Sequence, residues 1–371
     1  MKDVIVIGGG LAGLLNAIQL RRAGLNVLLF EEKKYPFHRV CGEYISNEVI
    51  PFLKKHQLYP EELDPSVISQ FHLSSISGKS LRMPLDLGGF GISRYAFDAW
   101  LAEKAKNEGV ELIHDRVVDS IFDGNSFTIK SKSGDQYHAT LVVGAFGKRS
   151  LLDKNLDRLF LRKRSPYIGV KYHIKTDEVD SSEIALHNFY GGYCGISRVE
   201  NDVFNLCYLS HRSNLKTHGS IPEMEKGLLA QNPHLKKIFS HSEILFEKPE
   251  VINEISFEKK EPVLNHILMS GDSAGMITPL CGNGMAMAIH SSKILSELII
   301  ENLKEGLNRS KLEHDYASKW NNQFAQRLWA GRHIQALFGS SIVSSSAVGL
   351  GKSFRPFASY LMKQTHGAPF S

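Results

Sequence analysis

The chain has 371 residues, 42% of them hydrophobic, so it can bury a sizeable core and form two domains. Its net charge of +5, from 44 basic and 39 acidic residues, is small and spread along the chain, which argues against nucleic-acid binding. The four cysteines are far apart and show no CxxC spacing, so we expect neither a metal site nor a disulfide framework. Without a signal peptide or an apolar run of ~18 residues, the sequence predicts a cytoplasmic protein.

The N-terminal end predicts a strand, a glycine turn, a helix and a second strand. Val4–Ile7 is a continuous apolar run, as expected for a parallel strand buried on both faces. Gly8, Gly10 and Gly13 then supply the GxGxxG spacing, in which the glycines allow a tight turn and a close approach of a pyrophosphate. Glu31 ends the second strand, where a carboxylate can accept hydrogen bonds from a ribose. The whole unit predicts dinucleotide binding.

The following residues predict elements around this unit. We expect a loop, a helix that Ser46 caps and that runs to Lys55, and a hairpin outside the parallel sheet over residues 67–92. Tyr95–Asn107 has the apolar spacing of an amphipathic helix. Three further strands are expected at Val117–Ile121, Ser126–Ser131 and Leu141–Gly144.

Alternating apolar residues between Leu161 and Glu261 predict an antiparallel sheet with one covered face and a helical insertion at Pro222–Phe239. The chain then returns to a buried strand at His266–Met269 and a long helix at Gly282–Glu301. Residues 1–66, 92–158 and 264–310 are therefore predicted to form one discontinuous nucleotide-binding domain, and residues 67–91 and 159–263 a substrate domain.

Residues 311–371 are expected to form a C-terminal helical region. Its helices are predicted at Lys311–Phe338 and Phe354–Gln364, with a Ser/Gly-rich turn region between them. The second of these helices is amphipathic with basic flanks. That pattern is compatible with peripheral membrane contact, although a short amphipathic stretch more commonly docks on its own domain.

A second glycine-rich stretch, GDSAGMITPLCGNGMAM, follows the strand at His266–Met269. Asp272 at the strand end can accept hydrogen bonds from polyol hydroxyls, and Pro279 sets a rigid turn. Gly282 to Met285 would present free N–H groups at a helix N-terminus, where they can stabilise negative charge on a ligand ring. A plain strand–helix turn is the alternative, because glycine-rich helix entries are common.

Taken together, these stretches resemble a known family. VIVIGGGLAGLLNAIQLRRAG with Glu31, ISRYAFDAWLAEKA and GDSAGMITPLCGNGMAMAI are similar to the p-hydroxybenzoate hydroxylase superfamily of flavoproteins, and within it to the geranylgeranyl reductase-like branch. The resemblance covers essentially the whole chain. It implies a Rossmann-like α/β fold with an α+β second domain, and FAD as the cofactor.

The resemblance also implies which residues contact FAD, with the glycine turn on the ADP half and the start of the long helix on flavin N1 and O2. Such a helix end favours the anionic reduced flavin, by about 1 kcal/mol per interaction. The implied positions are Gly8, Gly10, Leu11, Ala12, Gly13, Glu31, Glu32, Arg39, Arg94, Val118, Gly147, Gly271, Asp272, Pro279, Gly282, Asn283, Gly284 and Met285.

Departures from the family patterns narrow the range of reactions that we expect. Phe146 stands where hydroxylases of the superfamily have the acidic residue of GADGxxS, which weakens the expectation that NADPH binds as it does in those enzymes. The WxWxIP motif of the flavin halogenases is missing, which disfavours halogenation. There is no second GxGxxG for a dedicated nicotinamide domain.

We therefore expect an FAD-dependent oxidoreductase that reduces an apolar unsaturated substrate, such as an isoprenoid, a lipid or a polyketide, with NAD(P)H or a redox protein as electron donor. Cys41 resembles a cysteine that the reductase branch carries near the flavin, and a redox pair with Cys281 is a weaker hypothesis. The proton could come from Tyr44, Tyr193 or water. The rival functions are an NAD(P)H-dependent aromatic or polyketide hydroxylase and a non-catalytic prenyl-binding escort.

Overall fold

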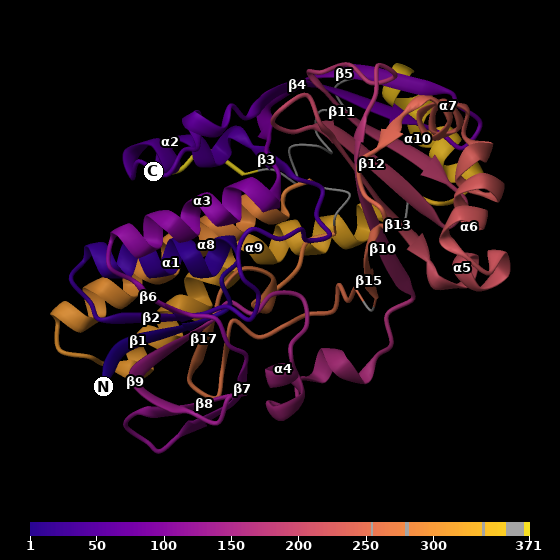
Figure 1. Ribbon diagram of the computed structural model, residues 1–371. Helices are drawn as coiled ribbons and strands as arrows, with labels where there is room; N and C mark the ends of the chain where they lie inside the picture. The colour runs from indigo at the N-terminus through magenta and orange to yellow at the C-terminus, as the bar shows by residue number, and fades with distance from the viewer. Residues whose placement is uncertain (254, 279–281, 336–337, 354–366) are drawn as a thin grey trace.

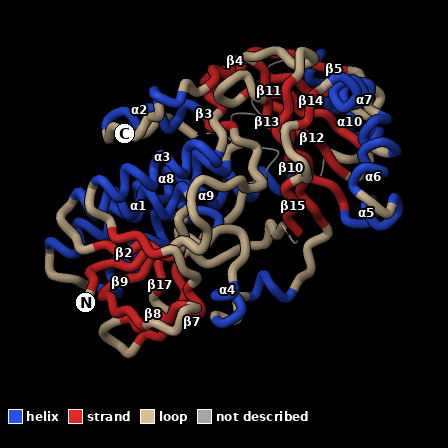
Figure 2. Tube along the Cα trace, viewed as in Figure 1, coloured by secondary structure: helices blue, strands red, loops and turns tan. Residues whose placement is uncertain are grey.

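The computed structural model describes residues 1–253, 255–278, 282–335, 338–353 and 367–371. Within these residues the strands form two separate sheets with helices packed around them (Figure 1, Figure 2). One sheet is largely parallel and the other largely antiparallel. The predicted α/β class with a mixed second unit is therefore confirmed.

The first sheet has the strand order β16-β17-β9-β1-β2-β6, and every neighbouring pair from β17 to β6 is parallel. The antiparallel ribbon β7–β8 joins it through β9. The strands are β1 (Lys2–Ile7), β2 (Val27–Phe30), β6 (Glu111–Ile113), β7 (Val117–Phe122), β8 (Phe127–Ser131), β9 (Gln136–Gly144), β16 (Val263–Leu264) and β17 (Ile267–Met269).

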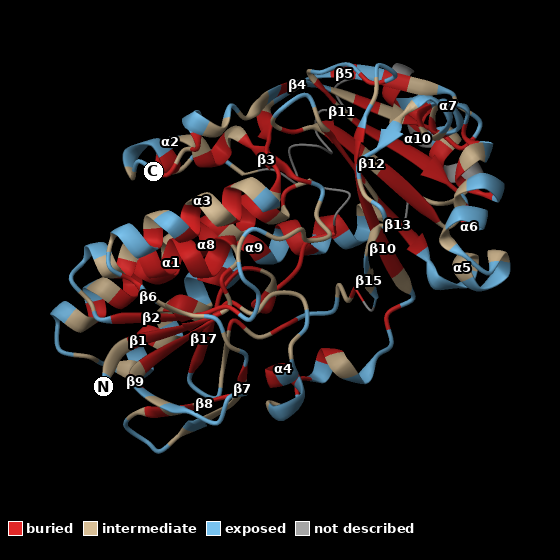
Figure 3. Cartoon of the chain, viewed as in Figure 1, coloured by how far each residue is buried: buried red, intermediate tan, exposed pale blue. Residues whose placement is uncertain are grey.

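Helices cover this sheet and complete its core. Figure 1 shows α1, α3 and α8 stacked on one side of the sheet and the β7–β8 ribbon on the other. The central strands and the inner faces of these helices are buried together (Figure 3), which is why β2 and the buried part of β1, Val4–Ile7, are apolar. The helices of this part are α1 (Leu11–Arg22), α2 (Ile50–Lys55), α3 (Arg94–Asn107), α4 (Leu151–Asn155), α8 (Gly284–Lys304) and α9 (Arg309–Gln335).

The second sheet has the order β14-β10-β13-β12-β11-β4-β5-β3, with β15 also paired to β10. Its strands are β3 (Tyr44–Ser46), β4 (Ser66–Ser74), β5 (Ser80–Gly91), β10 (Tyr167–Lys175), β11 (Glu183–Phe189), β12 (Gly192–Arg198), β13 (Phe204–His211), β14 (Glu243–Ile244) and β15 (Glu250–Asn253). Beside it lie α5 (Arg212–His218), α6 (Ile221–Gly227), α7 (Pro233–His241) and α10 (Ser341–Ser353). Short 3-10 turns are η1 (Asn47–Val49), η2 (Glu61–Leu63), η3 (Leu159–Arg162), η4 (Leu229–Gln231) and η5 (Gly271–Ser273).

The two faces of the second sheet have different neighbours. On one face, side chains such as Cys194 and Leu206 pack with residues of α6 and α7 into a separate core. On the other face, Leu186, Tyr193 and Leu209 pack with Met276, which follows η5 in the first part of the molecule. This second face, called the inner face below, therefore looks toward the predicted cofactor domain.

Several predicted elements need correction. The Ser/Gly-rich region expected to be a turn contains α10, because Val348 packs against Leu81 and Met83 and tertiary contacts override the weak helix propensity of Ser and Gly. The helical insertion is divided into α6, η4 and α7, and β11 pairs with β4 in parallel. The predicted helix Phe354–Gln364 lies entirely outside the described residues.

Two predictions about larger organisation, the domain boundaries and the peripheral membrane contact, stay predictions. The proposed domain boundaries stay a prediction, and β3 pairs with β5 of the second sheet although it lies within residues 1–66. In the part of the chain that the structure describes, none of the helices combines the length and apolarity needed to cross a bilayer.

Candidate functional site

The turn between β1 and α1 is shaped to accept a phosphate. Gly8 has φ +107°, and a Cβ at Gly13 would overlap the Gly8 carbonyl oxygen, so both positions require glycine. Gly10 is the N-cap of α1 and provides no side-chain cap, and the first turn of α1, which includes Leu11 and Ala12, has no acidic residue. The N–H groups of that turn are thus available to an anion, and the cradle fits the pyrophosphate of a dinucleotide.

Glu31 lies beside this turn, as predicted. Its side chain is buried at the end of β2, and one carboxylate oxygen accepts hydrogen bonds from the Gly9 N–H (3.0 Å) and from Arg39 Nη2 (2.8 Å). Glu32, in contrast, is half-exposed and pairs with Arg116 (Nε to Oε2, 2.8 Å). Only the first of the two adjacent acidic residues therefore faces the glycine turn.

Asp98 orients both predicted arginines. Arg94 Nε and Nη2 each lie 2.7 Å from the Asp98 carboxylate, and Arg39 Nε lies 3.3 Å from it. Arg94 Nη2 is also 3.2 Å from where a Cβ on Gly10 would lie. Burial disfavours the charge on Arg94, but Asp98 raises its pKa, with smaller contributions from Cys41 and Asp272. Asp98 thus holds the Arg94 guanidinium beside the glycine turn.

The second glycine-rich stretch is held by hydrogen bonds to its backbone. The Gly271 N–H donates to Ser291 Oγ (2.9 Å), and the Gly147 N–H donates to Ser273 Oγ (2.8 Å). Lys260, which is buried, donates to the Asp272 carbonyl oxygen (2.8 Å), and burial lowers its pKa to about 8. These bonds bring Gly147, Gly271 and Asp272 together at one end of the parallel sheet.

The start of α8 lies next to Tyr44. Asn283 is the N-cap of α8, Gly284 is its first residue and Met285 is buried. A Cβ on Gly282 would come within 3.1 Å of the Tyr44 ring. Burial, with a contribution from Glu48, raises the pKa of Tyr44. Pro279 and Cys281 lie outside the described residues.

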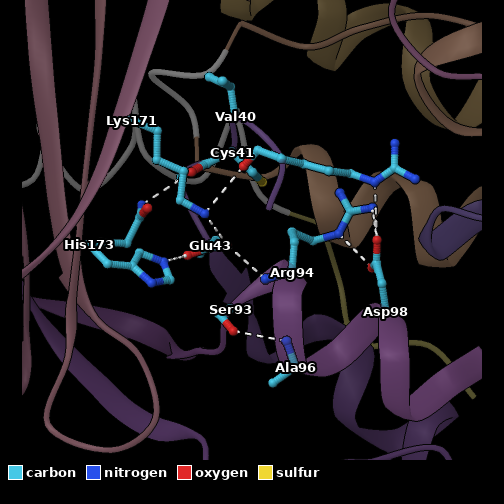
Figure 4. A network of polar contacts seen from close by, with 12 residues as sticks. Val40, Cys41, Glu43, Ser93, Arg94, Ala96, Asp98, Lys171 and His173 are labelled. Carbon is cyan, nitrogen blue, oxygen red and sulfur yellow. Dashed lines mark hydrogen bonds and ion pairs between the residues drawn. The ribbon is translucent and has the colours of Figure 1, made fainter. Parts of the chain in front are cut away.

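The loop from residue 39 to residue 43 crosses the inner face of the second sheet, and its backbone is held by side chains from outside the loop (Figure 4). Four consecutive carbonyl oxygens each accept a hydrogen bond from a different side chain. The pairs are Lys171 Nζ to Arg39 (3.2 Å), Lys148 Nζ to Val40 (2.9 Å), Asn205 Nδ2 to Cys41 (3.2 Å) and Ser197 Oγ to Gly42 (3.4 Å). This loop carries Cys41, so the sheet determines where that thiol lies.

Glu43 closes the loop with a buried ionic cluster. Its carboxylate, 0% exposed, accepts hydrogen bonds from the Arg94 N–H (2.7 Å), from Lys171 Nζ and from His173 Nε2 (2.7 Å) (Figure 4). Burial alone would raise the pKa of Glu43, but Lys171 and His173 lower it to about 2. The cluster connects the start of α3 with β10.

This pKa predicts how stability depends on pH. Because the folded-state pKa of about 2 is below the ordinary value of 4.5, the cluster stabilises the fold fully above pH 4.5. The contribution should be lost as the pH falls from 4.5 to about 2. We expect the free energy of unfolding to fall more steeply over this range in the wild type than in Glu43→Gln, as measured by urea unfolding. Exposed Glu103→Gln is the control and should keep the wild-type slope; equal slopes for all three proteins would contradict the expectation.

The remaining predicted residues lie further from the glycine turns. Val118 is in β7, where its carbonyl oxygen accepts from Asn155 Nδ2 (2.7 Å). Tyr193 is buried on the inner face of the second sheet, with its ring centroid 5.8 Å from that of Phe338. Among the described cysteines, Cys207 of β13 interacts with Cys41: burial and then Cys41 raise the pKa of Cys207 to about 12. The redox pair of Cys41 with Cys281 stays a hypothesis. Within the described residues, no three acidic, His or Cys side chains are arranged to hold a metal ion.

Sequence reasoning missed Asp98, Glu43, Lys148 and Lys171. The available signal was a charged residue where an apolar one is expected, as with Lys171 between Val170 and Tyr172 in the buried part of β10. A buried lysine needs a buried partner. The partner, Glu43, is 128 positions away in the sequence, so no local pattern identifies it.

Comparison with known proteins agrees with this geometry. Residues 3–38 match a family model described as an FAD binding domain. Digeranylgeranylglycerophospholipid reductase 1 of Methanopyrus kandleri is 24% identical over 351 residues, which cover 90% of this chain and 89% of that protein. A second reductase of that name from the same organism is 26% identical over 87% of this chain and 83% of its own length.

Solved structures show the same fold. A geranylgeranyl bacteriochlorophyll reductase-like protein from Thermoplasma acidophilum aligns with a TM-score of 0.77 at 17% identity, over 94% of this chain and 91% of that one. A flavin-dependent brominase aligns with a TM-score of 0.80 at 20% identity, over 97% of this chain and 93% of that one. At these identities the structures establish the architecture, which proteins with different reactions share.

Proposed function

We propose that this chain, an FAD-dependent oxidoreductase of the geranylgeranyl reductase-like type, reduces carbon–carbon double bonds of an apolar substrate that lies against the inner face of the second sheet. When bound and reduced, FAD would supply the hydride. The two Methanopyrus kandleri reductases compared above have a digeranylgeranyl lipid in their names. This supports an isoprenoid lipid as the substrate class.

The inner face of the second sheet carries the proposal. Leu186, Leu209 and Met276 form a buried apolar cluster together with Tyr193. Charged groups on the same face are paired within the protein, because Lys171 and His173 both contact Glu43. The part of the face next to the glycine-rich stretches is therefore suited to hydrocarbon rather than to a charged substrate.

The residues of the chain would divide the remaining tasks. The glycine turn and Arg94 would bind the pyrophosphate, Glu31 the ribose, and the N-terminus of α8 the pyrimidine end of the flavin ring. Of the two tyrosines, Tyr193 lies in the apolar cluster on the inner face of the second sheet, whereas the Tyr44 ring packs against Gly282 at the start of α8. We therefore assign Tyr193 as the proton donor. NAD(P)H or a redox protein as electron donor and peripheral membrane contact are further parts of the proposal.

Anaerobic mixing tests the reaction. Protein reconstituted with FAD and reduced by dithionite is mixed with a digeranylgeranyl lipid, and its fully saturated counterpart serves as the matched control. We expect reoxidation of the flavin only with the unsaturated lipid, with a pair of hydrogens gained per reduced double bond by mass spectrometry, and slower reoxidation in Tyr193→Phe. Failure of every unsaturated lipid to reoxidise the flavin contradicts reduction, and oxygen incorporation into an alkylphenol under air with NADPH would establish the hydroxylase instead.

A further inference from the structure

The buried carboxylate of Glu48 joins three segments that are far apart in the sequence. Glu48 is in η1 and is 0% exposed. Its Oε1 accepts a hydrogen bond from Arg327 Nη1 of α9 (3.1 Å). Its Oε2 accepts from Asn283 Nδ2 at the start of α8 (3.4 Å) and from the Gly367 N–H near the C-terminus. A helix cap and the chain end are thus bound to one side chain.

The C-terminal tail, residues 367–371, is packed onto the cofactor part of the molecule. The C-terminus lies beside α2 in Figure 1. The Phe370 N–H donates to the Glu48 carbonyl oxygen (3.2 Å), and the Phe370 ring stacks on His290 of α8 with centroids 3.8 Å apart. A Cβ on Gly367 would overlap the Arg327 guanidinium, so this position accepts only glycine without rearrangement. The tail therefore makes specific contacts rather than ending in solvent.

The contacts of Glu48 and the tail extend to the start of α8. Asn283, the cap of α8, is bound to Glu48, and Gly282 before it packs on the Tyr44 ring. His290, which contacts the tail, is on the same helix. The tail and Glu48 thus hold α8 both at its cap and further along its length. A buried, fully paired ionic group of this kind favours a single arrangement of the elements that it connects.

We infer that Glu48 and the C-terminal tail position the N-terminus of α8 against the flavin ring. The inference rests on the proposed binding of the flavin at that helix end. Glu48 is a positioning residue, since it acts through Asn283 and Arg327. Losing the tail contact should displace the α8 backbone and change the affinity and the electronic environment of the flavin.

Three variants test the inference. The first lacks residues 367–371, the second is Gly367→Ala and the third is Glu48→Gln. Glu183→Gln is the matched control, because Glu183 is also a buried carboxylate, paired with His72 (2.7 Å) and Arg82 (2.9 Å), but lies in the second sheet. The readouts are the dissociation constant of FAD, the visible absorption spectrum of the flavin and its midpoint potential, with circular dichroism as the check on folding.

We expect each of the three variants to bind FAD about tenfold more weakly than the wild type and to shift the flavin spectrum, whereas Glu183→Gln changes neither. The midpoint potential should rise in Glu48→Gln, because removing a negative charge near the helix end favours the reduced flavin. The variant that lacks residues 367–371 could fail to fold. In that case Gly367→Ala, which keeps residues 368–371, still tests the tail contact in a folded protein.

The outcomes separate this inference from the proposed function. If Gly10→Val abolishes FAD binding while the tail and Glu48 variants keep the wild-type affinity, spectrum and potential, the positioning role is wrong and the proposed cofactor site stands. If the wild type binds no FAD, or binds it equally well with Gly10→Val, the proposed cofactor site itself is wrong.

Discussion

Replacement of Lys171 by methionine should lower the free energy of unfolding by about 3–5 kcal/mol, because the Glu43 carboxylate would stay buried without its cation. The side chains of Lys171 and Glu43 are both 0% exposed. Methionine keeps most of the aliphatic volume of the lysine, so the loss reports the charge rather than a cavity. Equilibrium unfolding in urea measures it.

Two further variants make this measurement specific. Lys175→Met changes an exposed lysine on the same strand and should alter stability by no more than about 0.5 kcal/mol. The double variant Lys171→Met/Glu43→Gln should recover part of the loss, since it removes both charges. A loss below about 1 kcal/mol for Lys171→Met would show that Glu43 does not depend on this partner.

The elements that the sequence predicts well are those whose signals lie within one short segment. The N-terminal unit is an example, because an apolar strand, the glycine turn around Gly10 and a terminal Glu31 follow one another without interruption. Helix α3 is another: Ser93 caps it by accepting from the Ala96 N–H (3.0 Å), and apolar residues follow at helical spacing. Both are found at the predicted residues within one or two positions.

Elements that depend on distant partners are predicted less well. β3 is only three residues long and becomes a strand because it pairs with β5. β11 lies parallel to β4, a neighbour more than a hundred residues away, although the local pattern indicates an antiparallel sheet. Helix α10 forms in a Ser- and Gly-rich segment because Val348 is buried against the second sheet. In each case tertiary contacts outweigh local propensity.

The residues of the candidate site also fall into two groups, those that a local sequence pattern identifies and those that it does not. The residues expected to bind the cofactor are adjacent to glycine motifs, so a pattern could identify them. The residues that orient them are not: Glu48 contacts Arg327 and Gly367, which are 279 and 319 positions away. Asp98 carries no sequence signal apart from its place four residues after Arg94 on α3. Orienting residues become visible only when the chain is folded.

Replacement of Gly10 by valine should reduce FAD affinity at least about 100-fold, or ~2.7 kcal/mol, while leaving the fold intact. The backbone at Gly10 has φ −86°, which valine can adopt. The atom nearest to the added Cβ is Arg94 Nη2 at 3.2 Å, the end of a long side chain, which has to move by only a few tenths of an ångström. The valine methyl groups would instead occupy the space between α1 and Arg94 where the pyrophosphate is expected.

Fluorescence titration with FAD measures the affinity, and circular dichroism with thermal unfolding verifies the fold. Gly349→Val is the control of equal size, because Gly349 is exposed on α10 and an added Cβ there meets no atom within 4 Å. It should bind FAD like the wild type. A Gly10→Val protein that binds FAD within threefold of the wild type would place the pyrophosphate elsewhere, and Glu31 and Arg94 would then lose their proposed roles, since both are oriented toward this turn.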